Sequence, residues 1–274
     1  MADITLSSAT RSNLLSLQRT TDLIDRTQGR LSTGKKVNSA IDDALSFFKA
    51  RNLSDRASDL STIKNNITEG INVVQTAVKS LESMEDVIKQ MKALASTAKS
   101  EDSSTVRKTL ASQFNDLASQ LNHIVNDAEY NGVNLLNTSG ETFELVFSEQ
   151  TTTRRLDVDS TKLLAAQLGG GIDTAANDWA SAANPDTSLT NIDSALTKVR
   201  EEAQRFGTNA ALMEIRKDFT EEMINTLEGG ASQLVNADVN AESANMLALQ
   251  TRQQLGTISL SIAQQSEQSV LRLF

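Results

Sequence analysis

Hydrophobic residues near the start of the chain recur at intervals of three and four. Together with the polar Thr21 and Gln28, they step by three and four along the series Leu14, Leu17, Thr21, Ile24, Gln28 and Leu31. Such spacing places side chains in a narrow stripe along one side of a helix, as at the seam of a coiled coil. Because the stripe is partly polar, the pattern predicts a helix that needs a partner to become stable.

A helix break is predicted at residues 32–38. Gly34 can adopt the left-handed conformation that ends helices. Asn38 or Ser39 can cap the next helix, with Asp42 three residues beyond Ser39 as in a capping box.

The middle of the chain has a broader hydrophobic stripe, which is typical of a helical bundle. Residues 40–99 contain no Pro, and apolar side chains recur there every seven residues. A second helical pattern runs from Val106 to Ile124 and ends before Asn131-Gly132, a turn signal. We expect these two helices to form an antiparallel hairpin.

Residues 142–160 alternate between apolar and polar side chains, which predicts a β-hairpin with its tip at Thr151–Thr153. Gly169–Gly171 and the Ala-, Asn- and Asp-rich residues up to Thr187 are interpreted as surface connections.

A helical pattern returns at Leu189 and continues to Leu227, and Gly229 and Gly230 follow it as a predicted hinge. Beyond them, a second narrow and partly polar stripe steps by three and four along Ala248, Thr251, Leu255, Ile258, Ile262 and Gln265. The two ends of the chain thus carry similar stripes and are predicted to pair.

The predicted fold class is mainly α, a long antiparallel helical rod or coiled coil with a small β-hairpin subdomain. The expected parts are an N-terminal seam helix (1–38), the first part of a helical rod (39–137), a β-hairpin and short variable region (138–188), the second part of the rod (189–231) and a C-terminal seam helix (232–274).

Composition supports this prediction and excludes several functions. The chain has one Pro, no Cys and a net charge of -9, so disulfides are excluded and nucleic acid is a poor partner. No segment has the ~20 apolar residues of a membrane span, and the N-terminus lacks the pattern of a cleaved secretory signal. We therefore expect no membrane insertion and, if the chain is exported, a dedicated export machine.

Candidate catalytic chemistry is sparse. His123 is the only histidine, so a two-histidine metal site cannot form. Asp42 and Asp43 are interpreted as helix-start acids, and Gly169–Gly171 lacks the Lys-Ser or Lys-Thr of a phosphate loop. We expect neither enzymatic activity nor a cofactor or metal.

Several ordered sequence blocks resemble bacterial flagellin. They are the blocks LSTGKKVNSAIDDA from Leu31, GINVVQTA from Gly70, EYNGVNLL from Glu129, LVNADVNAESA from Leu234 and LQTRQQLG from Leu249. The resemblance covers both flanks of the chain in the family's order, and the middle is too short for large outer domains.

The resemblance implies a structural subunit that polymerises into a secreted, extracellular filament for swimming motility. It implies partners of four kinds: further copies of the chain or sister flagellins, hook-associated and cap proteins, an export chaperone, and the flagellar secretion apparatus. The alternatives are a hook-filament junction protein and, with less support, an intracellular coiled-coil adaptor.

The resemblance also implies a site for an innate immune receptor. Relatives that activate a Toll-like receptor present an Arg, a Leu and a Glu, which align with Gln90, Leu94 and Gln113 here. Since both charged positions are neutral, charge-assisted contacts would be lost and we expect weak activation.

Overall fold

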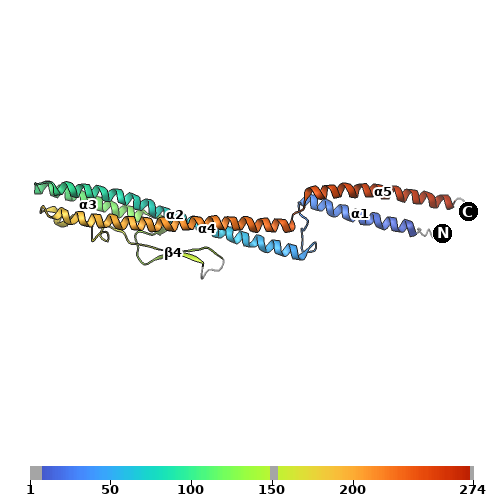
Figure 1. Ribbon diagram of the computed structural model, residues 1–274, viewed down its shortest axis with the longest axis horizontal. Helices are drawn as coiled ribbons and strands as arrows, with labels where there is room; N and C mark the ends of the chain where they lie inside the picture. The colour runs from blue at the N-terminus through green and yellow to red at the C-terminus, as the bar shows by residue number, and fades with distance from the viewer. Residues whose placement is uncertain (1–7, 149–153, 272–274) are drawn as a thin grey trace. The chain divides into compact units, whose positions relative to one another are not determined.

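The computed structural model describes residues 8–148 and 154–271, which are mostly helical (Figure 1). The helices are α1 (Ser8–Thr33), α2 (Ala44–Lys99), α3 (Ser104–Asp127), α4 (Asn184–Val235) and α5 (Val239–Leu271), with a short 3-10 helix η1 (Ala176–Trp179). The strands are β1 (Glu129–Tyr130), β2 (Val133–Asn134), β3 (Thr142–Val146) and β4 (Arg155–Asp159). The mainly α fold with a small β-hairpin is confirmed.

The chain divides into two compact units. Residues 1–57 and 225–274 form the first, called the terminal unit below, and residues 58–224 form the second, called the rod unit. Both α2 and α4 contribute residues to each unit. The terminal unit therefore includes more of the chain than the predicted segments 1–38 and 232–274.

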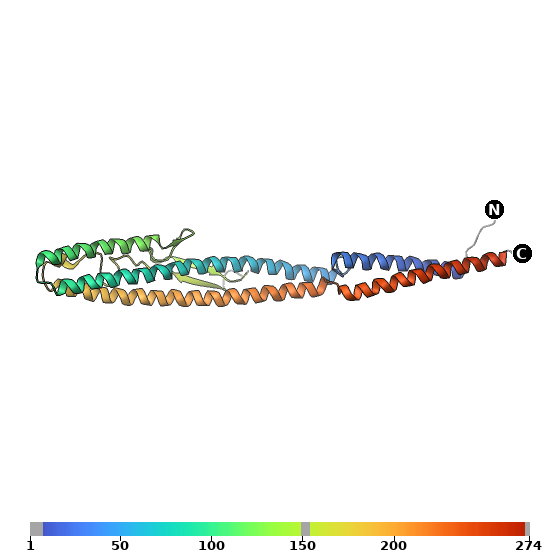
Figure 2. The same cartoon turned by 90° about the horizontal axis from the view of Figure 1, so that it is seen from above.

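In the terminal unit, α1 and α5 lie side by side (Figures 1 and 2). α1 ends at Thr33, and Gly34 follows it with a φ of 67°, in the left-handed region that favours glycine. The backbone N–H of Ala237 donates to Gly34 O at 2.9 Å, and that of Lys36 donates to Val235 O at 2.7 Å. The connection after α1 is thereby hydrogen-bonded to the connection before α5.

The predicted helix break at Gly229 and Gly230 is wrong. α4 continues through both glycines to Val235. Glycine in a helix costs only about 1 kcal/mol relative to alanine, and burial of the next residue, Ala231, offsets that cost. The actual break is at Asn236–Asp238, where Oδ1 of Asp238 accepts hydrogen bonds from the first N–H groups of α5.

The start of α2 is capped by Asp43, not by Asn38 or Ser39 as predicted. Oδ1 of Asp43 accepts a hydrogen bond of 3.1 Å from the backbone N–H of Ser46. Asp42 instead accepts the N–H groups of Asn38 and Ser39, both at 3.0 Å, and closes the loop before the helix. The hydrogen bond expected for a capping box, from the N–H of Ser39 to Asp42, therefore forms, but it closes a turn before α2 and does not cap the helix.

The rod unit is built around a three-helix core from α2, α3 and α4. α3 runs back along α2, as Figure 2 shows, so the predicted helical hairpin is formed. The seven-residue series Ile67, Val74, Leu81, Ile88 and Ala95 is fully buried. Phe114 of α3 and Phe206 of α4 pack in the same core.

Two small antiparallel hairpins follow α3. β1 pairs with β2 across the Asn131-Gly132 turn, and β3 pairs with β4 with Leu145 opposite Leu156. Leu145 also contacts α2, because its Cδ atoms lie 3.0 Å from where a Cβ on Gly70 would be. The predicted tip at Thr151–Thr153 lies outside the described residues.

Residues 169–183 are irregular, as predicted for connections, but they are not confined to the surface, because Ile172, Ala175 and Trp179 are buried; residues 184–187 already belong to α4. Residues 160–183, called the strap below, cover the helices and bury six apolar side chains: Leu163, Ala165, Leu168, Ile172, Ala175 and Trp179. The strap has no regular secondary structure except η1, so its backbone is bonded partly by turns, such as Ile172 N–H to Ala165 O, and partly by side chains of the helices. Asn122 and Asn115 of α3 accept the N–H groups of Ala165 and Ala175.

The end of the strap is held by a buried arginine. Nε of Arg107 donates to Trp179 O at 3.1 Å, and Nη2 donates to Ala180 O at 3.2 Å. The indole N–H of Trp179 donates to Ser188 Oγ at 2.9 Å. These bonds hold Trp179 at a φ of 52°, which is rare outside glycine.

Candidate assembly surfaces

The contact between α1 and α5 is close, because one of its positions is a glycine. A Cβ on Gly256 of α5 would lie 2.7 Å from Cδ2 of Leu17 of α1, so the glycine admits that leucine. At the other end of the contact, Nη1 of Arg30 donates to Oε1 of Glu242 at 2.9 Å. The side chain of Glu242 is 11% exposed and that of Arg30 is 34% exposed, so this ion pair is partly shielded from solvent.

The face of α1 that is buried within the chain is rich in threonine. Thr20 and Thr27 are buried, whereas Leu17 and Ile24 on the same face are half-buried. Thr20 Oγ1 donates to Ser16 O of the preceding turn at 2.8 Å, so the hydroxyl brings no unsatisfied group into the contact.

The predicted stripe residues divide into two sets. Leu17, Ile24 and Leu31 are half-buried on the side of α1 that contains the buried threonines. Leu14 is 42% exposed. Leu14 is therefore not covered within one chain, and its place in the polymerisation seam stays a prediction.

The apolar residues predicted for the seam on α5 are exposed within one chain. Leu255, Ile258 and Ile262, which together with Leu247 are called the α5 stripe below, are 61%, 56% and 61% exposed, and Leu247 is 69% exposed. The half-buried residues of α5 are a different set at the same three-four spacing: Met246, Leu249, Gln253, Gly256, Leu260 and Ala263. Within one chain, α5 thus turns this mixed face to α1 and leaves its apolar stripe uncovered, and the role of the stripe in polymerisation stays a prediction.

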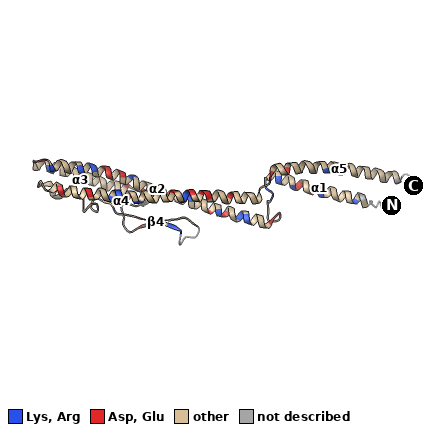
Figure 3. Cartoon of the chain, in the orientation of Figure 1, with Lys and Arg blue, Asp and Glu red and all other residues tan. Residues whose placement is uncertain are grey.

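Few charges interrupt this surface. The sequence of α5 has three charged residues, Glu242, Arg252 and Glu267, and Figure 3 shows the helix almost without charge colours. Burying such a surface against another apolar one requires little desolvation of charge.

The loop between α1 and α2 holds two carboxylates in their ionised form. Hydrogen bonds from the backbone N–H groups of Asn38 and Ser39 lower the pKa of Asp42. The hydroxyl and then the backbone N–H of Ser46 lower the pKa of Asp43. Both act as backbone caps, as expected for helix-start acids.

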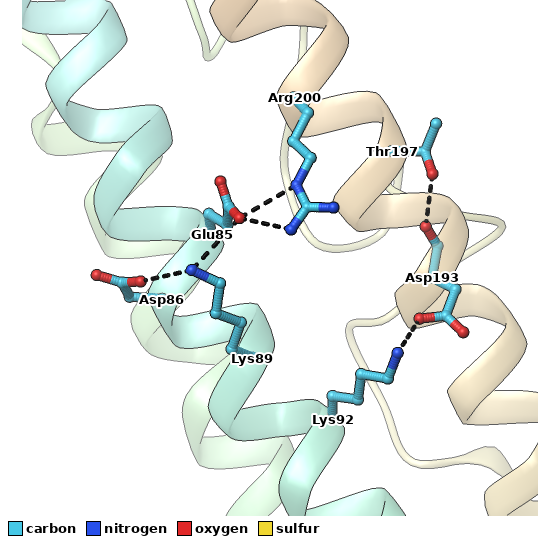
Figure 4. Close-up of polar contacts among 7 residues, drawn as sticks. All are labelled: Glu85, Asp86, Lys89, Lys92, Asp193, Thr197 and Arg200. Atoms are coloured by element: carbon cyan, nitrogen blue, oxygen red, sulfur yellow. Dashed lines mark hydrogen bonds and ion pairs between the residues drawn. The ribbon is translucent and has the colours of Figure 1, made fainter.

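Ion pairs connect α2 and α4 along one side of the rod unit (Figure 4). Arg200 donates to Glu85 Oε1 through Nη2 at 2.7 Å and through Nε at 3.1 Å. Seven residues along, Nζ of Lys92 lies 2.5 Å from Oδ1 of Asp193. A further seven along, Lys99 pairs with Asp186. The spacing is that of two antiparallel helices in one fixed register.

The three positions aligned with the immune-receptor site lie on the rod unit. Gln90 and Leu94 are on α2 and Gln113 is on α3. Both glutamines are exposed, whereas Leu94 is half-buried against the core.

Among residues 8–148 and 154–271, no helix combines the length and hydrophobicity needed to cross a membrane. The same ranges contain no group of three or more His, Asp or Glu side chains arranged to hold a metal ion. The exposed His123 is in no such group.

Comparison with known proteins identifies the class. Residues 4–141 match the bacterial flagellin N-terminal helical region, and residues 189–274 match the bacterial flagellin C-terminal helical region. The chain belongs to the flagellin family, whose members are structural subunits that polymerise into the flagellar filament used for motility.

Two curated relatives extend over nearly the whole chain. Flagellin FljM of Caulobacter vibrioides is 30% identical over 95% of this chain and 94% of its own length. A flagellin of Brucella melitensis is 29% identical over 100% of this chain and 99% of its own. Similar lengths agree with a short form that lacks large outer domains.

A solved structure of a flagellar hook-associated protein from Vibrio parahaemolyticus shares the fold. Its TM-score is 0.62 at 15% identity, and the match covers 71% of this chain and 100% of that one. At this identity the likeness concerns the fold alone. Nothing favours the hook-associated alternative over a filament subunit.

Proposed function

We propose that this filament subunit joins neighbouring copies through the α5 stripe. The observation that supports the proposal is that this stripe is more than half exposed in the single chain. Burying each of its aliphatic side chains would contribute about 1.5–3 kcal/mol. A second copy supplies the covering surface, because the family assembles from identical subunits.

The test is assembly of a double variant, Leu255→Ser with Ile262→Ser. The expected result is a monomer with unchanged helical content that forms no filament at concentrations where the natural chain does. The matched control is Gln250→Ser with Thr257→Ser, at exposed polar positions on another side of the same helix. Normal filaments from the Leu255/Ile262 variant, judged by electron microscopy and sedimentation, would refute the proposal.

We also propose that α1 and α5 become ordered only as the subunit joins the filament. Their shared contact is small and partly polar, and isolated helices are marginal because nucleation is unfavourable. Hydrogen exchange on dilute monomer should show fast exchange at the backbone of α1 and α5 and protection of the rod unit. Protection of both ends in the monomer would contradict the idea.

Such order on assembly is compatible with export of an unfolded chain. We propose export through the flagellar secretion apparatus with a dedicated chaperone, followed by addition beneath the cap proteins at the end of the filament. Family membership supports this route. Recovery of the chain from filaments sheared off intact cells, and its loss from the medium when the export apparatus is disabled, would test it.

The rod unit is proposed to activate the Toll-like receptor weakly. The support is the presence of two exposed neutral side chains, Gln90 and Gln113, where charged residues occur in activating relatives. Restoring the charges as Gln90→Arg with Gln113→Glu should raise the response in a receptor reporter assay. An ordinary flagellin response from the natural chain would overturn this idea.

A further inference from the structure

Two more groups of large apolar side chains are exposed, and neither is part of the α5 stripe. On α4 in the rod unit, Leu212, Ile215 and Phe219 are 43%, 67% and 53% exposed; they are called the α4 stripe. In the terminal unit, Ile41, Leu45 and Phe48 are 96%, 66% and 55% exposed; they are called the Ile41 patch. Single exposed apolar residues are common, but contiguous groups mark interaction surfaces.

The α4 stripe has the spacing of a continuous helical face, and the Ile41 patch combines a loop residue with the first turns of a helix. Leu212, Ile215 and Phe219 are separated by three and four residues, so they form a ridge along α4. Leu45 and Phe48 are separated by three residues at the start of α2, and Ile41 lies in the loop just before it. Both surfaces thus present an aromatic ring with aliphatic neighbours.

The charges around the two groups are opposite. Residues 207–224, which contain the α4 stripe, have four acidic and two basic side chains. Residues 34–57, which contain the Ile41 patch, have five basic and three acidic ones. Oppositely charged surroundings favour encounter of the two surfaces and disfavour contact of either surface with itself.

Two charges flank the apolar helical faces. Asp218 follows Ile215 by three residues; its side chain is 73% exposed and lies 4.0 Å from Lys217 Nζ. Lys49 follows Leu45 by four residues and is also exposed. Asp42 and Asp43, which follow Ile41, are instead bonded within their own loop and helix start. At helical spacing each charge lies beside its apolar group, so contact of the two groups brings the lysine to the aspartate.

We infer that the α4 stripe of one subunit packs on the Ile41 patch of a second copy. This inference rests on assembly into a filament and specifies a contact additional to the α5 stripe. A contact between two different surfaces of one chain is heterologous, and repetition of such a contact generates an open helical polymer. Each of the two surfaces, the α4 stripe and the Ile41 patch, is thus covered by the other surface of a neighbouring copy.

The absence of cysteine makes the contact directly testable. Single variants Phe219→Cys and Phe48→Cys are mixed, polymerised with the natural chain in excess and oxidised gently. Disulfide-linked dimers are expected from the mixture but not from filaments that carry either variant alone. The matched control pairs Phe48→Cys with Glu214→Cys, an exposed position on another side of α4.

Two results would overturn the inference. One is a mixture that yields no more dimer than the Glu214→Cys control; the other is abundant dimer from Phe219→Cys alone, which would show a symmetric contact. In either case the filaments themselves still form, so the proposed role of the α5 stripe is tested independently, by its own double variant.

A second measurement does not depend on disulfide geometry. Ile215→Ser with Phe219→Ser should leave the unfolding of the monomer unchanged, because both side chains are exposed. The double variant should raise the critical concentration for assembly about tenfold or more, because removing two apolar anchors weakens a contact by at least that factor. An unchanged critical concentration would overturn the inference.

Discussion

A Cβ atom on Gly169 would lie 1.9 Å from the backbone oxygen of Asn191. Gly169 is in the strap and Asn191 is in α4, so the two backbones approach more closely than any side chain would allow. The φ of Gly169 is 58°, a conformation that also disfavours other residues. The side-chain amide of Asn191 then donates to Gly171 O at 3.0 Å and fixes the same turn.

Gly169→Ala should therefore destabilise the monomer by about 2 kcal/mol or more, because either the strap or α4 must move. Gly207→Ala is the matched control: nothing lies within 4 Å of its Cβ position, in mid-helix. That control should gain about 0.5–1 kcal/mol. Urea unfolding followed by circular dichroism and by the fluorescence of Trp179 measures both. Equal stabilities of the two variants would contradict the packing of the strap.

The ion pair between Glu85 and Arg200 provides a test of helix register. Glu85→Lys places a third cation beside Arg200 and Lys89 and should cost about 1 kcal/mol, because these charges are only partly shielded from water. The double variant Glu85→Lys with Arg200→Glu should recover most of that loss. Added salt should shrink the difference between the single variant and the natural chain. A double variant less stable than both singles would show that the two charges do not interact.

Glu202 gives the rod unit a predicted dependence on pH. Burial of its carboxylate opposes ionisation, but hydrogen bonds from Lys198 and Arg205 outweigh burial and lower the pKa. Arg205 also donates to Asp159 O, so the group links α4 to the end of β4. Because the pKa is lower in the folded state, the stabilisation is complete above the ordinary glutamate range and is lost as pH falls through the lowered pKa.

Glu202→Gln should thus destabilise the monomer at neutral pH by roughly 1–3 kcal/mol, and the deficit should shrink as the solution becomes acidic. Glu201→Gln, at an exposed neighbouring position, is the control and should leave stability unchanged. Urea unfolding at several pH values gives the comparison. A deficit of equal size at every pH would show that the charge of Glu202 does not contribute.

The helices of the rod unit were predictable because their cores consist of large apolar residues at regular spacing. Ile67 to Ala95 repeat every seven residues, and every member of that series is buried. The turn at Asn131-Gly132 was equally predictable from the sequence. Both residues have a positive φ, and a two-residue hairpin turn of that kind strongly prefers Asn followed by Gly. Local chemistry alone determines these features.

The strap and the terminal contact were not predictable for a different reason. The strap is held by side chains distant in sequence, such as Asn115 and Arg107, and its own sequence has no period. In the terminal contact, Thr20 and Gly256 occupy positions where a search for large apolar residues finds nothing. Hydrogen bonds between residues distant in sequence, and close approaches of two backbones, produce no recognisable pattern in a single sequence.

The approach of Leu17 to Gly256 provides the test of the terminal contact. Gly256→Leu should prevent the close packing of α1 on α5, because Cγ of Leu17 already lies 3.1 Å from the added Cβ position. The critical concentration for assembly should then rise by about tenfold or more, the equivalent of ~1.4 kcal/mol. Leu17→Ala with Gly256→Leu exchanges the large and the small side chain and should restore much of the loss.

The matched control is Thr257→Leu, at the adjacent exposed position of α5. Its side chain points away from α1 by about 100°, the rotation per residue of an α-helix, so any defect it causes does not arise in the contact with Leu17. Rescue by Leu17→Ala of Gly256→Leu, but not of Thr257→Leu, would assign the effect to the pairing of the two chain ends. If Leu17→Ala rescued neither variant, the two helices would pack differently in the filament, and the exposed α5 stripe rather than Gly256 would face α1.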